Sequence, residues 1–268
     1  MFRQRSSPTA QPRTPSGFRA YAVGDIHGRL DLLDQILTMI EQDAERSPAR
    51  KSLLIFLGDL IDRGPDSRGV VERLRTYRHG RLQTYFLAGN HEEVLLRLLA
   101  GECGLLEGWL KFGGAECLRS YGIDPSSLTG MSEREALAVV RDAIPDEHRQ
   151  FIATFVDTLR LGDYLFVHAG VRPGLDLSLQ SQFDLRWIRA PFLDCEDDHG
   201  MVVVHGHTIS ESVDEQANRI GIDTGAYRTG ILTALCLEGK ERWTLDTASV
   251  SVGNETASEL VGNETAAH

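Results

Sequence analysis

The chain is 268 residues long and 41% hydrophobic, which is enough to bury one large core. Its formal net charge is −11. We therefore expect neither nucleic acid nor an anionic membrane surface as a partner, because both require a basic face on the protein. No stretch approaches the roughly 18 consecutive apolar residues that are needed to span a bilayer. One domain with a small helical insertion is the expected organisation.

The two ends of the chain differ in composition from the rest. Residues 1–17 hold three arginines with Ser, Thr and Pro but no acidic residue, and they lack the apolar segment of a secretory signal. Residues 247–268 are rich in Ser, Thr, Gly, Asn and Glu, and they contain the hexapeptide Val-Gly-Asn-Glu-Thr-Ala twice, at 252–257 and 261–266. We predict a flexible tail at 1–17 and a disordered tail at 247–268.

The four cysteines show no spacing that is typical of a zinc site or a redox pair. Structural disulfides are characteristic of oxidising compartments, so we expect free thiols in a reducing compartment. Together with the lack of a secretory signal, this predicts a cytoplasmic protein.

The first hundred residues predict three units of strand, loop and helix. Strands are expected at 19–23, 53–57 and 83–88, and the first two are followed by amphipathic helices at 30–46 and 67–77. A cluster of polar residues stands at the same end of each strand. This order predicts a parallel sheet whose polar clusters converge on one edge.

The rest of the chain changes from helices back to strands. A helical insertion is predicted at about 93–160, and the whole catalytic domain is expected to cover 18–246. Its expected helices and the later strands are as follows: helices at 93–100, 104–111, 132–143 and 146–159, strands at 164–167, 201–204 and 219–222, and an antiparallel pair at 231–237 and 241–245.

Residues of metal-ligand type stand at the ends of five strand-like runs. Oxygen and imidazole ligands without thiolate suit Mn²⁺, Fe or Zn²⁺. Six ligands are too many for one ordinary site, but they divide between two ions about 3.5–4 Å apart if one carboxylate bridges both. We predict that Asp59 is the bridge. The expected sets are Asp25, His27 and Asp59 for one ion, and Asp59, Asn90, His168 and His207 for the other.

Three segments carry a resemblance to a known family. They are Gly-Asp-Ile-His-Gly at 24–28, Gly-Asp-Leu-Ile-Asp-Arg-Gly at 58–64 and Gly-Asn-His-Glu at 89–92. Their order and spacing, together with the later His168 and His207, resemble the phosphoprotein phosphatase family of calcineurin-like metallophosphoesterases. The resemblance implies an α/β fold in which a β-sandwich is flanked by helices and carries a helical insertion.

One branch of that family looks most similar to this chain. The segments at 109–114, 187–189 and 222–226 resemble the small bacterial and phage lambda-type serine/threonine protein phosphatases. The resemblance covers about 20–245. It implies hydrolysis of phosphomonoesters by direct attack of a metal-bridging hydroxide on phosphorus, with no phosphoenzyme. Of the ions named above, Mn²⁺ is the favoured one.

The resemblance also implies roles for residues beside the metals. His91 would protonate the leaving alkoxide as general acid, and Asp62 would hold it protonated and oriented. Arg63 and Arg189 would bind phosphate oxygens, because the planar fork of guanidinium donors matches phosphate geometry. Arg186 lies close by in the sequence and is the rival candidate to Arg189.

Three functions are compatible with these motifs. The main hypothesis is a serine/threonine protein phosphatase that acts on a phosphorylated protein and also on phosphotyrosine. The first alternative is a symmetrical diadenosine tetraphosphate hydrolase. That related branch usually departs from the Asp-Arg-Gly present here at 62–64 and from the His-Gly at 27–28. The second alternative is a non-catalytic docking module that binds metal, which would be expected to lack a ligand or the acid.

Five further residues have expected positions outside the predicted ligand sets. We expect His205 to lie behind the ligands or in the core, because the family's ligand is the histidine directly after the glycine. Asp223 has two open interpretations, in which it orients a metal-binding histidine or starts a turn. The remaining three lie in polar stretches and are expected to be solvated: His79, His148 and His199.

Overall fold

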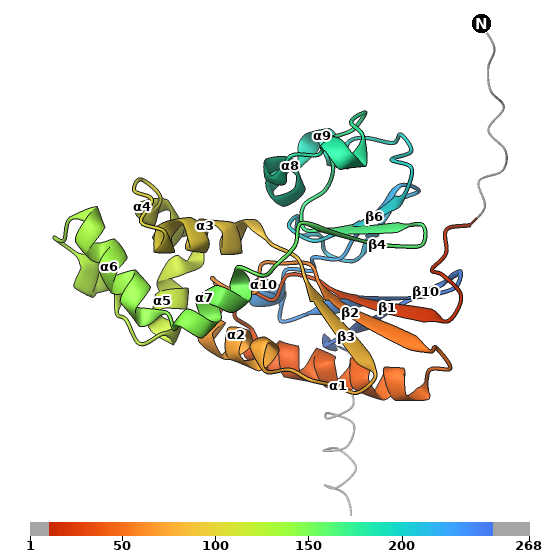
Figure 1. Cartoon of the computed structure of the whole chain (residues 1–268), viewed down its shortest axis with the longest axis horizontal. Helices are drawn as coiled ribbons and strands as arrows, with labels where there is room; N and C mark the ends of the chain where they lie inside the picture. Colours follow the sequence, from red (N-terminus) through yellow and green to blue (C-terminus); the bar gives the residue numbers. More distant parts are fainter. Residues whose placement is uncertain (1–10, 249–268) are drawn as a thin grey trace, which may run out of the picture.

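The computed structural model describes residues 11–248 of the chain. Two five-stranded sheets pack face to face (Figure 1). Helices α1 and α2 lie on the outside of the first sheet, and α8 and α9 lie on the outside of the second. The predicted fold class, an α/β fold with a β-sandwich flanked by helices, is confirmed. Within the described residues, no helix is long and apolar enough to cross a membrane.

Both sheets mix parallel and antiparallel strands. The first has the order β10-β9-β1-β2-β3. Its strands β1, β2 and β3, which run from the centre of the sheet to one edge, are parallel, as predicted. The second has the order β4-β5-β6-β8-β7. The strands are β1 Phe18–Val23, β2 Lys51–Phe56, β3 Leu82–Phe86, β4 Thr158–Leu161, β5 Tyr164–Val167, β6 Val202–His205, β7 Asp214–Glu215, β8 Arg219–Gly221, β9 Thr233–Glu238 and β10 Glu241–Asp246.

Strands β1 and β2 of the first sheet are buried on both faces, which explains why their residues are mostly apolar without alternation. In β1, Tyr21 and Val23 belong to the core beneath the helices, whereas Ala20 and Ala22 belong to the core between the sheets. Strand β2 divides its residues in the same way. The strands are therefore fixed from both sides, and the loops at their carboxyl ends are held in place.

Helices α1, Leu30–Arg46, and α2, Ser67–Arg75, cover the outer face of the first sheet. The buried side chains of α1 recur every three or four residues, as a helix with one apolar face requires. Asp66 caps α2 through a hydrogen bond from the Gly69 N–H at 2.7 Å. Each of the two helices directly follows a loop that carries predicted metal ligands.

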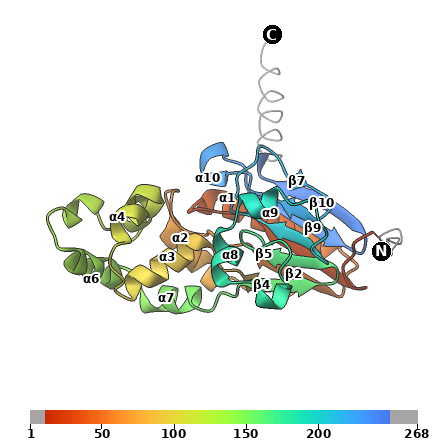
Figure 2. The same cartoon turned by 90° about the horizontal axis from the view of Figure 1, so that it is seen from above.

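The helical insertion forms a lobe at one end of the sandwich in both views (Figures 1 and 2). It runs from α3 to α7 and returns to the second sheet through β4. The helical elements from here to the end of the described chain are α3 Asn90–Leu99, α4 Leu106–Trp109, the π-helical turn η1 Leu110–Gly114, α5 Ala115–Ser120, η2 Pro125–Leu128, α6 Glu133–Ala143, α7 Asp146–Ile152, η3 Leu177–Leu179, α8 Gln182–Trp187, α9 Ala190–Leu193 and α10 Ala226–Thr229.

Two predicted helices are wrong in extent. The helix predicted at 146–159 ends at Ile152, because Val156 instead extends the sheet. Its N–H donates to the Phe86 carbonyl at 3.1 Å, and its carbonyl accepts the Ala88 N–H at 2.9 Å. The helix predicted at 104–111 is only the short α4, and the chain then continues through η1 into α5.

His148 is not solvated, which corrects the prediction. It is 3% exposed. Its Nδ1 lies 2.9 Å from the Tyr121 hydroxyl and its Nε2 lies 3.0 Å from a Glu72 oxygen, so it joins α7 to α5 and α2. The other two histidines expected in solvent, His79 and His199, are half-buried.

The beginning of the described chain lies against the sandwich, in contrast to the tail expected at 1–17. The Thr14 N–H donates to the Gly239 carbonyl at 2.9 Å, and the Thr14 hydroxyl accepts the Gly239 N–H at 2.8 Å. The repeated hexapeptide lies outside the described residues. All four cysteines are free thiols.

Candidate functional site

The predicted ligands follow the carboxyl ends of strands at one edge of the sandwich. His27 follows β1, Asp59 follows β2, and Asn90 begins α3 shortly after β3. His168 and His207 follow β5 and β6 of the second sheet. All of these residues are buried, and none is more than 8% exposed. Strands β1, β2 and β3 run parallel in the first sheet, and β5 and β6 run parallel in the second, so the polar loops of each set leave at one end and meet at the same place.

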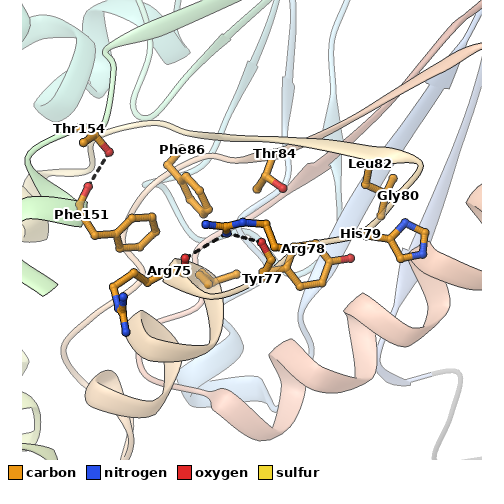
Figure 3. A pocket seen from close by; sticks show the side chains of 11 residues that line it. Arg75, Tyr77, Arg78, His79, Gly80, Leu82, Thr84, Phe86, Phe151 and Thr154 are labelled. Atoms are coloured by element: carbon orange, nitrogen blue, oxygen red, sulfur yellow. Dashed lines mark hydrogen bonds between the residues drawn. The ribbon is translucent and has the colours of Figure 1, made fainter. Parts of the chain in front are cut away.

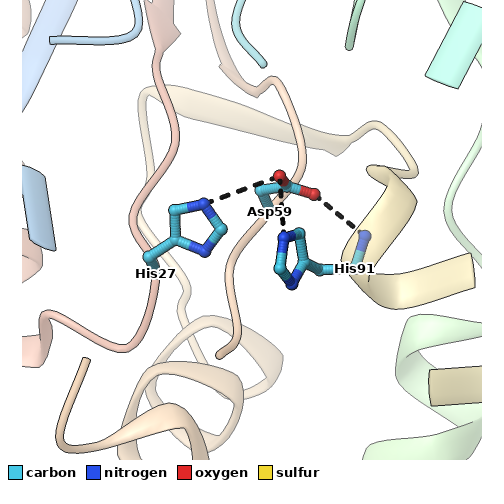
Figure 4. A group of neighbouring side chains, drawn as sticks. All are labelled: His27, Asp59 and His91. Atoms are coloured by element: carbon cyan, nitrogen blue, oxygen red, sulfur yellow. Dashed lines mark hydrogen bonds and ion pairs between the residues drawn. The ribbon is translucent and has the colours of Figure 1, made fainter. Parts of the chain in front are cut away.

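Asp59 lies between two groups of possible metal ligands. The first is His27, Asp59 and His91 (Figure 4), and the second is Asp59, His168 and His207. Within each group, one ligand atom per residue lies within 4.8 Å of the others. Oδ2 of Asp59 is 3.6 Å from Nε2 of His27, and Oδ1 is 3.4 Å from Nε2 of His168. The two oxygens thus face different groups, as a bridging carboxylate requires.

Of the predicted ligands Asn90 and Asp25, the first lies within a ligand group and the second lies outside both groups. Oδ1 of Asn90 lies 3.0 Å from Nε2 of His168, within the second group. The carboxylate of Asp25 is outside both groups, and it accepts the backbone N–H of His207 at 3.1 and 3.2 Å. The first group instead includes His91, which was expected only as the acid. Ligation by Asp25 therefore stays a prediction.

Backbone carbonyls orient two of the histidine rings. Nδ1 of His27 lies 2.8 Å from the Ile61 carbonyl, and Nδ1 of His168 lies 2.8 Å from the Leu57 carbonyl. Because a carbonyl only accepts, Nδ1 carries the proton and the Nε2 lone pair faces the shared carboxylate. Burial lowers the pKa of His27 to about 3 and that of His207 to about 2, so these rings are neutral, as metal ligands must be.

Backbone strain is concentrated at this site. In the described part of the chain, every non-glycine residue with positive φ is one of the candidate site residues. Such conformations cost about 1–3 kcal/mol each and persist only where the surroundings enforce them. The residues are His27 (φ 46°), Asp59 (φ 49°), Asp62 (φ 71°), Arg63 (φ 68°) and His207 (φ 63°).

Glu92 has a role that the sequence interpretation missed. Its buried carboxylate accepts three backbone N–H groups, from Asp59 at 2.9 Å, Leu60 at 2.8 Å and Gly89 at 3.0 Å. It therefore ties the strained loop after β2 to the start of α3. The signal was present in the Gly-Asn-His-Glu segment, whose glutamate received no assignment.

The predicted acid and its partner are in contact. Nδ1 of His91 lies 2.6 Å from Oδ2 of Asp62, which is completely buried. The same oxygen accepts the indole N–H of Trp109 at 2.9 Å. Burial opposes protonation of His91, but the carboxylates of Asp59 and Asp62 outweigh it and raise the pKa of His91 above its usual range. Trp109 was noted in the sequence only as a family feature.

Arg63 reaches into the first group. Its guanidinium lies 3.0 Å from Nε2 of His27 and stacks over the ring of Tyr227, 4.9 Å from its centroid. The strained backbone of Arg63 is held by the Gly113 carbonyl, which accepts its N–H at 3.0 Å. Arg63 is thus fixed between the metal ligands and the helical lobe.

The structure distinguishes the two rival arginines. Arg186 is bound by carboxylates, with Nε 2.8 Å from Asp157 and Nη1 3.3 Å from Glu93. Arg189 instead lines the cleft that opens above the ligands. The cleft has a volume of about 420 Å³. Its lining consists of Arg63, Asn90, His91, Val94, Leu105, Gly108, Trp109, Phe112, Trp187, Arg189 and His207.

The two remaining expectations concern residues behind the ligands. Oδ1 of Asp223 accepts the Gly225 N–H at 2.9 Å, which is the turn interpretation. His205 is 1% exposed and packs edge-on against Phe192, with ring centroids 5.0 Å apart. It belongs to neither ligand group and lies in the core, as expected.

The comparison with known families agrees with this geometry. The calcineurin-like phosphoesterase family matches residues 18–230, which is most of the chain. The chain belongs to this family. It is therefore a metallophosphoesterase, a hydrolase from a family that uses divalent metal ions.

Individual relatives within the family differ in activity. The chain is 27% identical to a symmetrical bis(5'-nucleosyl)-tetraphosphatase of Legionella pneumophila (strain Corby), over 86% of this chain and 98% of the relative. It is 38% identical to serine/threonine-protein phosphatase 1 of Salmonella typhimurium, over 35% of this chain and 38% of the relative. The crystal structure of a candidate diadenosine tetraphosphatase shares the fold, with a TM-score of 0.59, 22% identity, and coverage of 90% and 96%.

The residues present fit a pair of divalent cations. Nε2 of His207 is buried and has no hydrogen-bond partner. Burial, and then the negative charges of Asp223 and Asp59, raise the pKa of Asp25 well above its usual range. Such crowding of buried carboxylates is relieved by cations. The first ion would be held by His27 and Asp59, and the second by Asp59, Asn90, His168 and His207. Bound ions would activate water and neutralise phosphate charge.

Metal binding should stabilise the fold measurably. Divalent ions that bind only the folded protein raise its free energy of unfolding, by about 2.7 kcal/mol at 100 times the dissociation constant. We expect Mn²⁺ to raise the melting temperature of the chelator-treated protein. Calorimetric scans with Mn²⁺ and with Ca²⁺ as the control would measure this. Equal melting temperatures with and without Mn²⁺ would contradict the ligand sets.

Two adjacent glycines allow the helical lobe to approach the site. A Cβ atom on Gly113, where φ is 115°, would lie 2.5 Å from the backbone nitrogen of Arg63. A Cβ atom on Gly114 would lie 2.3 Å from the indole of Trp109. The close packing places Trp109 against Asp62. The indole N–H of Trp109 therefore couples the helical lobe to His91 and Asp62, the predicted acid and its partner.

Replacing Trp109 should impair catalysis more than metal binding. Trp109→Phe keeps an aromatic ring but removes the hydrogen bond to the Asp62 carboxylate. Because hydrogen bonds to charged groups contribute about 1.5–3 kcal/mol, we expect kcat on an alkyl phosphate monoester to fall about tenfold. Steady-state kinetics with metal titration would measure it. Trp243→Phe, on β10, is the matched control and should change neither quantity. A wild-type kcat in Trp109→Phe would refute the coupling.

Proposed function

We propose that the protein is a metal-dependent protein phosphatase that removes phosphate from phosphoserine and phosphothreonine, and also from phosphotyrosine. The observation that carries the proposal is the buried contact between His91 and Asp62. An alkoxide leaving from serine or threonine is a strong base and must be protonated as its bond to phosphorus breaks. A nucleoside diphosphate is a much weaker base, so cleavage of a dinucleoside tetraphosphate needs no such acid.

Each residue then has a defined part in the reaction. Asp62 holds Nδ1 of His91, so the proton for the leaving oxygen is carried on Nε2. Arg63, which lies beside the first ligand group, and Arg189, which lines the cleft, bind the phosphate oxygens. Oxygen and imidazole ligands without thiolate suit Mn²⁺, Fe or Zn²⁺. Among these ions we favour Mn²⁺, which the resemblance to the lambda-type phosphatases implies. The four free thiols support a reducing, cytoplasmic setting.

Symmetrical hydrolysis of diadenosine tetraphosphate is the second candidate. Two observations favour it. The similarity to the Legionella enzyme extends over nearly the whole of that relative. The cleft also exposes aromatic rings, those of Phe112 and Trp187, on which a nucleobase could stack. The same metal centre would serve both reactions.

One experiment separates the two candidates. Phosphate release from a phosphothreonine peptide and cleavage of diadenosine tetraphosphate are measured in parallel with Mn²⁺, each with a chelator control. We expect the peptide to have the higher kcat/KM and the chelator to abolish its turnover. A higher kcat/KM for the dinucleotide would transfer the function to the second candidate, while the site and its metals would stand.

A further inference from the structure

A second cavity lies at the open edge of the first sheet, between the end of α2, strand β3 and helix α7 (Figure 3). Its volume is about 600 Å³, and it shares no lining residue with the cleft above the ligands. The family match and the proposed reaction give it no role. Its walls combine three features that would rarely coincide by chance: an unpaired strand edge, a cation without an acidic partner, and an aromatic wall.

The unpaired edge belongs to β3. At one end, the Leu82 N–H donates to the His79 carbonyl at 3.3 Å, and at the other, the Phe86 carbonyl accepts the Val156 N–H at 3.1 Å. Alternate residues of a strand present their backbone groups to the same edge. Thr84 stands midway between Leu82 and Phe86, so its N–H and its carbonyl face outward at the cavity. An extended peptide can pair there, as exposed strand edges allow.

The cavity is basic although the protein is acidic. Its lining contains Arg75, Arg78 and His79 but no Asp or Glu, against a formal net charge of −11 for the chain. Arg75 is neutralised by Glu72, at 2.8 Å. Arg78 is not: its two hydrogen bonds go to the carbonyls of Arg75 and Tyr77, and no ion pair involves it in the part of the chain that the structure describes. Several of its five N–H donors therefore stay available.

The aromatic wall stands at one end of the cavity. The rings of Phe86 and Phe151 pack edge to face, with centroids 4.8 Å apart, and both remain half-buried. In Figure 3 the guanidinium of Arg78 points toward these rings, whereas the side chain of Arg75 points away from the cavity. An apolar side chain and an acidic one can thus be accommodated next to each other.

We propose that this cavity docks an extended acidic peptide of a partner protein alongside β3. Its backbone pairs with Thr84, a carboxylate binds Arg78, and an apolar side chain packs on Phe86 and Phe151. Side chains that share one face of a strand are two residues apart. The recognised pattern is therefore an acidic and an apolar residue separated by one residue. A free backbone edge favours a peptide over a small anion, because a small anion would leave it unpaired.

The test is direct binding of a designed peptide. The probe is fluorescein-labelled Ser-Asp-Thr-Phe-Thr-Asp-Ser, which places Asp, Phe and Asp on one face and reads the same in both directions. Fluorescence anisotropy with the full chain should show saturable binding. Arg78→Glu should weaken it tenfold or more, since a charge-assisted contact becomes a repulsion. Lys240→Glu makes the same change of charge at the turn between β9 and β10, and it should alter the affinity less than twofold.

Two further probes identify the occupant. The same peptide N-methylated at both Thr and at Phe cannot donate from these backbone nitrogens and should bind at least tenfold more weakly. Unchanged nitrophenyl phosphate hydrolysis by Arg78→Glu would show that this variant is folded. The proposal is overturned if wild type does not bind the probe up to about 1 mM, if Arg78→Glu binds it equally well, or if the N-methylated peptide or inorganic phosphate alone binds as tightly.

Discussion

Asp59→Asn is expected to lower phosphoester hydrolysis at least a thousandfold and to reduce the binding of both metal ions. Each oxygen of Asp59 faces a different ligand group, and the carboxylate lies among four histidines. An amide of the same shape offers one oxygen and no charge. It would therefore serve one ion poorly and the other not at all. A thousandfold loss corresponds to about 4 kcal/mol of transition-state stabilisation, within the contribution expected of metal ions.

Three measurements on Asp59→Asn separate a lost site from a lost fold. Metal content after equilibration with Mn²⁺ reports the ions, kcat/KM on nitrophenyl phosphate reports the reaction, and the melting temperature without metal reports the fold. The amide has the shape of the carboxylate and keeps an oxygen that can accept the His91 N–H, which lies 3.1 Å from Oδ1 of Asp59, so the metal-free variant should keep a cooperative melting transition. Asp34→Asn, on the exposed face of α1, is the control. Near-normal turnover by Asp59→Asn would exclude the bridging role.

The convergence of the ligands could be predicted because it follows from the backbone. An apolar run that stops at a glycine predicts a buried strand, and parallel strands end at one edge. His27 and Asp59, which follow the parallel neighbours β1 and β2, needed no other information to be placed together. The left-handed backbone of Asp59 and His207 could not be predicted in this way, since it depends on contacts that enforce it. Glu92, which holds the loop after β2, is one such contact.

Other features were hidden because they depend on packing between distant segments. Trp109 donates to Asp62 across 47 positions of the sequence. His148 looked solvated because its neighbours in the sequence are polar, yet it is buried where α7 meets α2 and α5. Asp25 stands beside β1 as expected, but its orientation toward the His207 N–H is set by the second sheet. Local pattern predicts which residues reach the site, and tertiary packing decides where each side chain points.

His91→Asn should slow the reaction by an amount that depends on the leaving group. Its loss removes the proton donor but none of the four predicted ligands of the second ion. General acids contribute about 10²–10⁴-fold. We therefore expect kcat on a phosphothreonine peptide to fall at least a hundredfold. Nitrophenyl phosphate, whose leaving group is a weak base, should lose less than tenfold, and so should diadenosine tetraphosphate if it is cleaved.

The same comparison distinguishes His91 as an acid from His91 as a metal ligand. Its imidazole lies near Asp59 and within the first ligand group, so His91→Asn could act by weakening that ion. A lost ligand slows every substrate by the same factor and is reversed by more Mn²⁺. A lost acid slows only substrates with strongly basic leaving groups, and added metal does not restore them. Equal slowing of peptide and nitrophenyl phosphate at saturating Mn²⁺ would therefore show that His91 is not a general acid, and the protein phosphatase proposal would lose its support.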